Sequence, residues 1–233
     1  MQFTQERTVG EIAAAEPASI RVFESLGIDY CCGGKRGLAE ACSRAGVSVG
    51  DVIDRIAEAE RNAHAPAPAA WANAPLEALI RHVVERHHAY IRTEAPRIQG
   101  LLEKVISRHG NAHPEIAQIR DLFTAAAQEL FTHMLKEEQV LFPYIARMGQ
   151  PQPAPFFGSV ARPIAQMMAE HDDAGALFSQ MNQLSGGYAP PQGACPKFRA
   201  LYQALAEFEL DLHEHVHLEN NVLFPRALVL ERG

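Results

Sequence analysis

An eleven-residue phrase that occurs twice is the feature that most limits how this chain folds: HMLKEEQVLFP at 133–143 and HVHLENNVLFP at 215–225. Both copies keep a His in first place, a Glu four residues later and the closing Val-Leu-Phe-Pro. In an α-helix, residues four apart lie one turn apart on the same face. Each copy therefore predicts a helix that presents one His and one Glu side by side.

Apolar residues extend each of these faces at alternating steps of three and four residues, the spacing of a buried helical stripe. Two further segments show the same spacing and also carry a histidine. The four predicted stripes are Val84, His88, Ile91, Ala95, Ile98 and Leu102; Ile119, Phe123, Ala126, Leu130, His133, Glu137 and Val140; Ile164, Met167, His171, Ala174, Phe178 and Met181; and Leu201, Leu205, Phe208, Leu212, His215, Glu219 and Val222. In the first stripe His87 fits the upstream residues Ile80 and Val83, and only the downstream spacing favours His88. Every predicted helix thus directs a histidine into the core.

Three clusters rich in Gly and Pro, at 109–114, 149–155 and 185–196, separate these stripes. They leave four helices of roughly 30 residues each, a length at which antiparallel packing into a bundle is the usual solution. No segment alternates apolar and polar residues with the period of a strand. The fold class predicted for 76–233 is therefore an all-α, antiparallel four-helix bundle.

A small helical domain is predicted ahead of the bundle, at 1–60, because short helical patterns there are broken by several glycines. It is followed at 61–75 by an Ala/Pro stretch that suits an extended linker better than a helix.

Histidines and glutamates at stripe positions predict a metal site. Each buried imidazole or carboxylate costs several kcal/mol in desolvation, roughly, unless a partner compensates it, and a bound cation does so. The predicted ligands are His88, His133, Glu137, His171, His215 and Glu219. They are too many for one tetrahedral zinc and suit two ions that share the carboxylates. Ligand softness leaves iron, zinc, manganese and copper open, and mixed nitrogen and oxygen ligation favours iron.

A competing motif lies in the same region, because HEHVH at 213–217 matches the H-E-x-x-H pattern of zinc peptidases. By the helical repeat, however, His213 and His217 fall with Asn220 on a polar face that points away from His215. We therefore predict that this motif is not a metal site.

Charge and composition exclude some partners. The chain has 21 Lys and Arg against 28 Asp and Glu, a net charge of -7, and it has no dense basic block, so nucleic acid is not an expected ligand. The N-terminal residues mix charges, and no stretch is apolar over the length of a membrane span, which predicts a cytoplasmic protein without membrane contact. In that compartment cysteines stay reduced, and Cys42 and Cys195 are expected to be buried thiols without a role.

Two adjacent cysteines stand out in DYCCGGKRGLAEAC at 29–42. Neighbouring cysteines bridge each other only with strain, so a structural disulfide between Cys31 and Cys32 is not expected. Two interpretations remain open. Either the pair performs thiol chemistry, with the basic residues at 35–36 lowering the pKa of the thiols, or both are ordinary cysteines.

The motifs DYCCGGK, HMLKEEQVLFP, AEHDDAG and HLENNVLFPRAL resemble those of the repair-of-iron-centres proteins, hemerythrin-like di-iron proteins of bacterial nitrosative and oxidative stress. The similarity runs nearly end to end. The resemblance implies that the six residues predicted above bind two non-heme iron ions, and it selects His88 over His87. It also implies an oxo bridge and carboxylate bridges from Glu137 and Glu219.

The same resemblance implies a role in restoring iron-sulfur centres damaged by nitric oxide or oxidants. The implied partners are nitric oxide or O2 as small ligand and iron-sulfur client proteins, with a weak homodimer also expected. Iron supply, nitric oxide binding, reduction of nitric oxide to nitrous oxide, and O2 or nitric oxide sensing remain alternatives. Oxygen-carrying hemerythrins typically have a fifth His one turn beyond the one on the third helix, where this chain has Gly175, and this disfavours an oxygen carrier.

Overall fold

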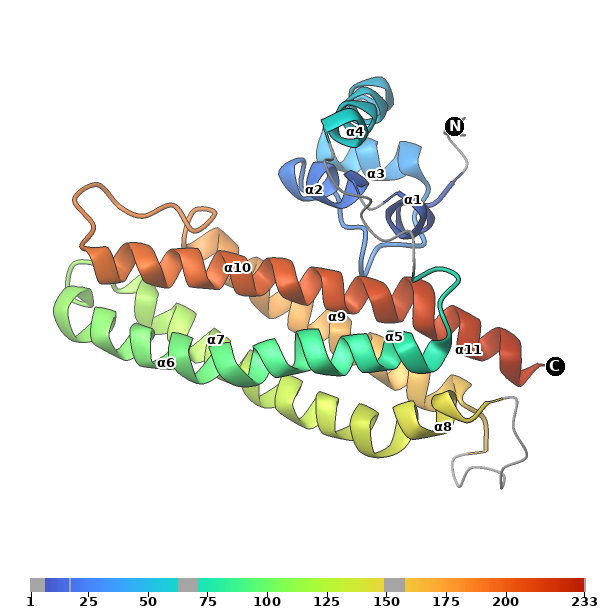
Figure 1. Ribbon diagram of the computed structural model, residues 1–233. Helices are drawn as coiled ribbons and strands as arrows, with labels where there is room; N and C mark the ends of the chain where they lie inside the picture. Colours follow the sequence, from blue (N-terminus) through green and yellow to red (C-terminus); the bar gives the residue numbers. More distant parts are fainter. Residues whose placement is uncertain (1–6, 17, 63–70, 149–157, 233) are drawn as a thin grey trace. The chain divides into compact units, whose positions relative to one another are not determined.

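The computed structural model describes residues 7–16, 18–62, 71–148 and 158–232, most of which are helical (Figure 1). Within these ranges no β-strand forms, and the extended pairing is limited to an isolated bridge between Thr8 and Gly37. Among the helices described, none combines the length and apolar character that crossing a membrane requires. The prediction of an all-α protein is confirmed.

The chain divides into two compact units. The first unit comprises Met1–Ile80, Met148–Pro151 and His213–Gly233, and the second comprises Arg81–Arg147 and Gln152–Leu212. The domain limits expected from the sequence stay a prediction, and most of the expected linker, 63–70, lies outside the described residues.

The first unit opens with four short helices, α1 (Val9–Ala15), α2 (Ala18–Ser25), α3 (Leu38–Ala45) and α4 (Val49–Asn62). Helix α1 begins at a capping box, in which the Thr8 hydroxyl accepts from the Glu11 amide at 3.2 Å and the Glu11 carboxylate accepts from the Thr8 amide at 3.0 Å. Helix α3 ends at Gly46, whose φ of 70° is one that glycine adopts without strain. Apolar residues from all four helices are fully buried, namely Ile12, Phe23, Leu38 and Ile56.

The remaining elements of the first unit come from other parts of the chain. They are most of α5 (Leu76–His82), the end of α10 (Pro196–Leu218), η3 (Glu219–Leu223) and α11 (Phe224–Glu231). The guanidinium of Arg226 in α11 donates to the carbonyl oxygens of Trp71 and Ala74 at 3.0 and 2.5 Å. These bonds hold the segment before α5 against α11.

The second unit contains four long helical segments. They are η1 (Val83–His88) with α6 (Ala89–His109); α7 (Glu115–Lys136) with η2 (Glu137–Leu141) and α8 (Phe142–Ala146); α9 (Ala161–Leu184); and α10 up to Leu212. Two connections fall at the predicted clusters 109–114 and 185–196, while the whole of the cluster 149–155 lies outside the described residues.

Three phenylalanines bring α7, α9 and α10 together in the core of this unit. The ring of Phe208 lies 5.4 Å from Phe123 and 5.5 Å from Phe178, measured between centroids, and Phe123 and Phe178 are 6.3 Å apart. Edge-to-face and stacked contacts of this kind stabilise aromatic pairs beyond the area that they bury. The all-α helical bundle predicted from the stripes is confirmed.

Three short π-helical segments, η1, η2 and η3, interrupt the helices, and the first two shift the buried stripe by one residue. A π-turn closes i to i+5 instead of i to i+4, so it inserts one residue without ending the helix. The expectation that Val140 is buried is therefore wrong: it is 36% exposed, and Leu141 is buried in its place. In the first stripe, Val84 is likewise half-buried while Val83 is fully buried.

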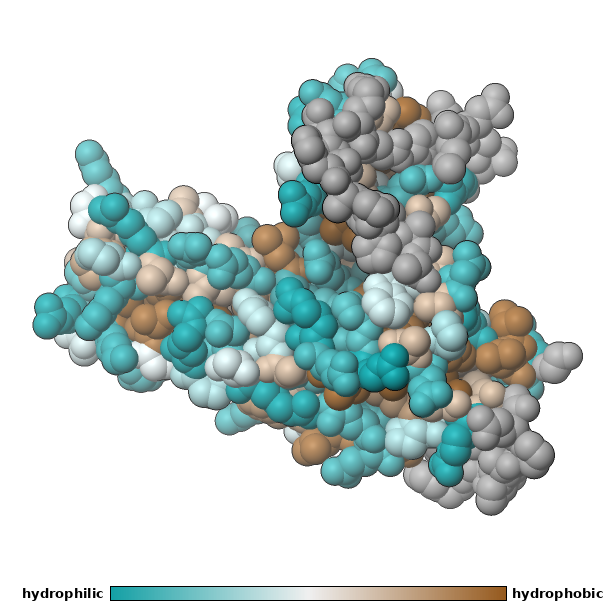
Figure 2. Space-filling view, viewed as in Figure 1, coloured by the Kyte–Doolittle hydropathy of each residue, from teal (hydrophilic) through white to brown (hydrophobic). Residues whose placement is uncertain are grey.

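Apolar side chains gather inside, and the face drawn in Figure 2 is predominantly hydrophilic. Among the described residues, the large apolar ones that stay exposed are Leu135, Val140, Leu184, Leu210, Val229 and Leu230. They are distributed over five helical segments, α7, η2, α9, α10 and α11. Against this background, a group of buried polar residues inside the helices requires an explanation.

Candidate metal centre

All six predicted ligands are buried, with at most 2% of each residue exposed. Three of them stand at the edge of a π-helical segment: His88 ends η1, Glu137 begins η2 and Glu219 begins η3. Such turns are frequent at functional sites, because they re-aim a side chain inside an otherwise regular helix. Both His87 and His88, at the end of η1, are buried.

Glu137 is the centre of the arrangement in the second unit. Its Oε2 lies 3.4 Å from Nε2 of His88, and its Oε1 lies 3.3 Å from Nε2 of His133. The Nε2 atoms of His133 and His171 are 3.0 Å apart. Three imidazoles and one carboxylate thus direct their polar atoms into one small space.

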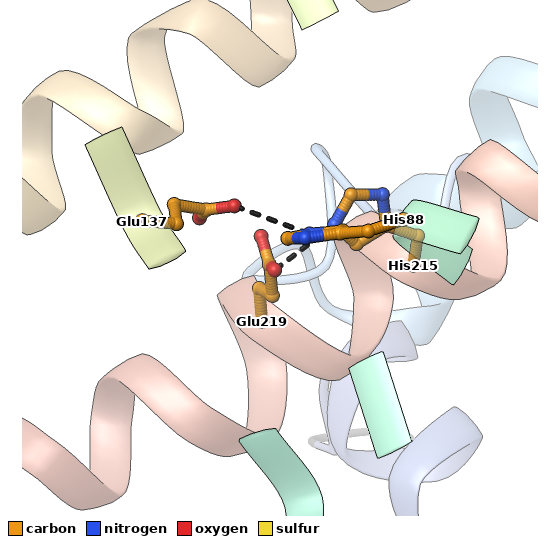
Figure 3. A group of neighbouring side chains, drawn as sticks. All are labelled: His88, Glu137, His215 and Glu219. Atoms are coloured by element: carbon orange, nitrogen blue, oxygen red, sulfur yellow. Dashed lines mark hydrogen bonds and ion pairs between the residues drawn. The ribbon is translucent and has the colours of Figure 1, made fainter. Parts of the chain in front are cut away.

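The other two predicted ligands are one turn apart on the last helical segment. Nε2 of His215 lies 2.9 Å from Oε1 of Glu219, and both residues are fully buried. Figure 3 shows the carboxylates of Glu137 and Glu219 directed toward the imidazoles of His88 and His215.

Two sets of possible ligand atoms result. One set is His88, Glu137, His215 and Glu219, and the other is His133, Glu137, His171 and Glu219. Within each set the ligand atoms lie within 4.8 Å of one another. Both glutamates belong to both sets, which is the arrangement that two neighbouring cations bridged by carboxylates require.

Carboxylates behind two of the histidines orient their rings. Nδ1 of His88 lies 2.6 Å from Oε1 of Glu138, and Nδ1 of His133 lies 2.9 Å from Oε2 of Glu170. A carboxylate accepts hydrogen bonds, so each Nδ1 carries the hydrogen and each Nε2 keeps a lone pair directed at the site. Metal-binding histidines almost always have such a partner, which fixes the tautomer and raises the basicity of the ring.

These carboxylates are themselves held in the charged form. Burial raises the pKa of Glu138, but hydrogen bonds from His88 and Arg92 lower it by more, so that the pKa lies below its usual value. Burial also raises the pKa of Glu170, and hydrogen bonds from Lys136, Gln166 and His133 outweigh it and bring the pKa to about 2. Both groups therefore accept hydrogen bonds as carboxylates at neutral pH.

The residues present fit a cation. In the described chain neither carboxylate oxygen of Glu137 forms a hydrogen bond, although both are completely buried. The two nitrogens that they face are lone-pair atoms, because His88 and His133 carry their hydrogens on Nδ1. A buried carboxylate and imidazole lone pairs repel one another unless a positive charge lies between them. The buried cluster of His and Glu thus has the donors and the geometry of a metal-binding site.

Comparison with known proteins agrees with this geometry. The model of the hemerythrin HHE cation binding domain matches residues 79–227, and a domain of unknown function (DUF542) matches residues 5–60. The iron-sulfur cluster repair protein YtfE of Pectobacterium carotovorum subsp. carotovorum (strain PC1) is 39% identical over 226 residues, covering 96% of this chain and 97% of that protein. YtfE of Escherichia coli O1:K1 / APEC is 38% identical over 228 residues, covering 97% and 99%.

This chain belongs to the YtfE family.

Membership of the YtfE family confirms the resemblance to repair-of-iron-centres proteins that the sequence motifs indicated. The hemerythrin domain contains all six buried residues of the cluster, and the second matched domain contains the adjacent cysteines.

His87 is buried beside the cluster but does not belong to it. Its Nδ1 lies 3.2 Å from Oδ2 of Asp211. The other carboxylate oxygen of Asp211, Oδ1, pairs with the guanidinium of Arg86 at 3.1 Å. His88, in contrast, is part of one set of possible ligands. Of the two histidines that the sequence left as alternatives, His88 is therefore the one directed at the candidate centre of this YtfE-family protein.

The prediction that HEHVH lies on a polar face is wrong for His217 and Asn220, because both are buried. His217 is only 2% exposed and Asn220 only 4%, because residues of the small helical domain cover this face. The ring of Tyr30 packs 5.3 Å from that of His217, and burial lowers the pKa of His217 to about 4. His213 lies 2.9 Å from a carboxylate oxygen of Glu24. Neither histidine belongs to a set of possible metal ligands among the described residues.

Neither of the adjacent cysteines forms a disulfide; Cys31 is buried and Cys32 is half-buried. The expected lowering of the thiol pKa is wrong for Cys31, because a hydrogen bond with Cys32 and burial raise its pKa well above the usual value. Asp29 adds to this effect, with Oδ1 at 3.5 Å from the Cys31 sulfur. The raised pKa means that Cys31 is a protonated thiol at neutral pH.

Sequence reasoning also missed several neighbours. Glu138 directly follows Glu137, and Glu170 directly precedes His171. Because neither lies on a predicted stripe, neither was expected to contact the site. A carboxylate next to a ligand is the one signal that was present. Cys195, expected to be buried, is half-buried, and its sulfur lies 3.2 Å from Nε2 of His109.

Proposed function

We propose that this protein restores iron-sulfur centres that nitric oxide or oxidants have damaged, and that it uses two non-heme iron ions bound by six residues. The ligands would be His88, His133, Glu137, His171, His215 and Glu219. The observation that carries this proposal is the pair of buried ligand sets that share both glutamates. Relatives named iron-sulfur cluster repair protein, similar over nearly the whole chain, support it.

The donor set favours iron. Four imidazole nitrogens and two carboxylates form a mixed donor set, and two ions sharing six protein ligands keep positions for exogenous ligands. Bound iron would supply a releasable metal and open positions for nitric oxide or O2. The chain itself excludes water from the site through complete burial of Glu137, Glu219 and His215.

Supplying iron to a client protein also requires a path to the surface. A cavity of about 430 Å³ between α7 and α9 reaches His133, which belongs to one ligand set. Three acidic residues, Glu129, Glu170 and Asp173, line it. Carboxylates exchange a hard cation readily with water, so this cavity provides a polar route next to a ligand. The clients would be iron-sulfur proteins of the cytoplasm, where the four free cysteines of this chain stay reduced.

Recovery of a damaged enzyme tests the proposal. An iron-sulfur enzyme inactivated by nitric oxide is incubated with the iron-loaded protein, and its activity is measured over time. We expect recovery with the loaded protein and none with metal-free protein or with Glu137→Leu, which removes a residue common to both ligand sets. Equal recovery from the same concentration of free ferrous iron would refute a specific role in repair.

Reduction of nitric oxide is the second candidate, because the shared glutamates place the two ligand sets side by side. Two nitric oxide molecules held next to each other can couple and, with two electrons and two protons, yield nitrous oxide and water. The electrons would come from the reduced protein or an external donor. Nitrous oxide formed in a single turnover by the reduced, iron-loaded protein would support this function, and its absence would exclude it.

A further inference from the structure

The two copies of the repeated phrase differ where the small helical domain contacts one of them. In the first copy Leu135 is 48% exposed and Gln139 is also exposed. The equivalent positions of the second copy are His217, which is 2% exposed, and Asn221, which is half-buried. At these two positions the second copy has different residues, and they are less exposed than their counterparts in the first copy.

Asn221 makes the most specific part of this contact. Its side-chain amide nitrogen donates to the carbonyl oxygens of Tyr30 and Cys31, at 3.2 and 3.1 Å. The same nitrogen lies 3.2 Å from Nδ1 of His217. A single side chain therefore binds the backbone of the segment that carries the adjacent cysteines.

Two glycines form a slot for the oxygen of this amide. A Cβ atom at Gly10 would lie 2.5 Å from Oδ1 of Asn221, and one at Gly34 would lie closer still. The Gly10 amide also donates to the Gly34 carbonyl oxygen at 2.8 Å, which keeps the two sides of the slot together. Gly34 ends the Cys-Cys-Gly-Gly motif. Gly34 of that motif thus serves to admit Asn221, which the sequence did not reveal.

Asn221 lies in the same π-helical turn as Glu219, which begins η3. Residues two positions apart on a helix point to opposite sides. Glu219 faces the metal centre, and Asn221 faces the cysteine segment. The turn η3 therefore connects the candidate metal centre to the cysteine segment through the two peptide bonds between Glu219 and Asn221 and the hydrogen bonds of the Asn221 amide.

We propose that Asn221 is a positioning residue that couples metal binding at Glu219 to the exposure of the Cys31 thiol. The inference rests on the proposed metal centre. Metal bound by Glu219 and His215 orders η3 and keeps Asn221 in its slot, so that the cysteine segment stays closed. Loss of metal loosens η3, and the buried Cys31 becomes accessible more often.

Thermodynamic linkage predicts how strongly metal binding at Glu219 changes the opening of the cysteine segment, and in which direction. Two sites that bias the same element change each other's equilibria by the same free energy, typically by about 5- to 150-fold. Cys31 is buried, so a reagent reaches it only when the segment opens, and its alkylation rate measures that opening. We expect bound metal to slow alkylation of Cys31 by about fivefold or more.

The experiment uses the full chain under anaerobic conditions, either metal-free or loaded with ferrous iron. Both samples are treated with iodoacetamide, and modification of Cys31 and of half-buried Cys32 is followed separately by peptide mass spectrometry. Bound iron is measured in the same samples. The wild type should show slower modification of Cys31 with iron than without, and Asn221→Ala should remove this difference.

Gly34→Ala perturbs the slot from the opposite side and should have the same effect, so the test remains valid if Asn221→Ala does not fold. Two matched controls should keep the wild-type ratio: Gln139→Ala, at the equivalent position of the first copy, and Gly37→Ala, where a Cβ meets nothing within 4 Å. Iron that binds without slowing alkylation in the wild type, or an unchanged ratio in Asn221→Ala and Gly34→Ala, overturns the coupling alone. Failure of the wild type to bind iron overturns the coupling and the proposed function together.

Discussion

Removing the carboxylate behind His88 tests whether the outer contacts of the site tune its affinity for metal. Oε1 of Glu138 lies 2.6 Å from Nδ1 of His88 and 2.7 Å from a guanidinium nitrogen of Arg92. Glu138→Ala leaves the His88 ring free to rotate and to change tautomer. Glu138→Gln keeps a hydrogen-bond acceptor but loses its charge, and charge-assisted bonds are roughly twice as strong as neutral ones.

The size of the effect follows from exposure. Loss of such a partner typically weakens metal binding by about 10- to 100-fold. The Glu138 side chain is 25% exposed, so water screens part of its charge and the lower end of this range applies. We expect Glu138→Ala to weaken binding about tenfold, or about 1.4 kcal/mol, and Glu138→Gln to fall between it and the wild type.

Competition with a chelator of known affinity under anaerobic conditions measures these constants. Glu103→Ala is the control, because that side chain is 65% exposed and its ion pair with Arg120 is 3.9 Å long. If Glu138→Ala bound ferrous iron as tightly as the wild type, the orientation of His88 by this carboxylate would not matter and the reasoning would be wrong. Glu170→Ala, behind His133, should behave like Glu138→Ala.

Three further predictions concern the helices and the core. Glu137→Leu should abolish metal binding. It should also raise the free energy of unfolding of the metal-free protein by about 1 kcal/mol or more, because an apolar residue replaces a buried charge. Urea denaturation with and without chelator measures both effects. Phe208→Ala removes the ring between Phe123 and Phe178 and should cost about 3–5 kcal/mol, whereas Leu210→Ala, at an exposed position, should change stability by less than about 0.5 kcal/mol in the same assay. Burial and the nearby Glu115 raise the pKa of Tyr202 from 10.0 to about 12, so its contribution to stability is fully present below pH 10 and is lost as the pH rises to about 12. Tyr202→Phe should remove one late component from the ultraviolet titration of the tyrosines, and an unchanged titration would contradict the raised pKa.

Much of the bundle was predictable because a buried stripe depends on local geometry alone. Every apolar member of the third and fourth predicted stripes is buried. The exceptions are Val84 and Val140, and both lie in π-helical turns. A sequence pattern does not reveal such a turn, because the extra residue is stabilised by what the helix packs against and not by local propensity.

The candidate site was predictable to the same extent. The residues predicted as ligands from spacing are those that the structure brings into two sets. The carboxylates of Glu138 and Glu170 were not predicted, since their contacts join different helices. The high pKa of Cys31 was also unexpected, because it depends on the hydrogen bond with Cys32, on burial and on Asp29, and the basic residues at 35–36 do not offset these effects.

What the sequence by itself determined is the identity of the polar residues that face the interior of the bundle, because spacing of three and four residues selects one side of any helix. Only the tertiary structure decided which of those residues meet, which carboxylates stand behind them, and how Asn221 reaches the segment that carries the cysteines. The physical reason is that helical periodicity is a property of neighbouring residues, whereas desolvation, hydrogen-bond partners and pKa values arise from groups that are distant in the chain and become neighbours only on folding.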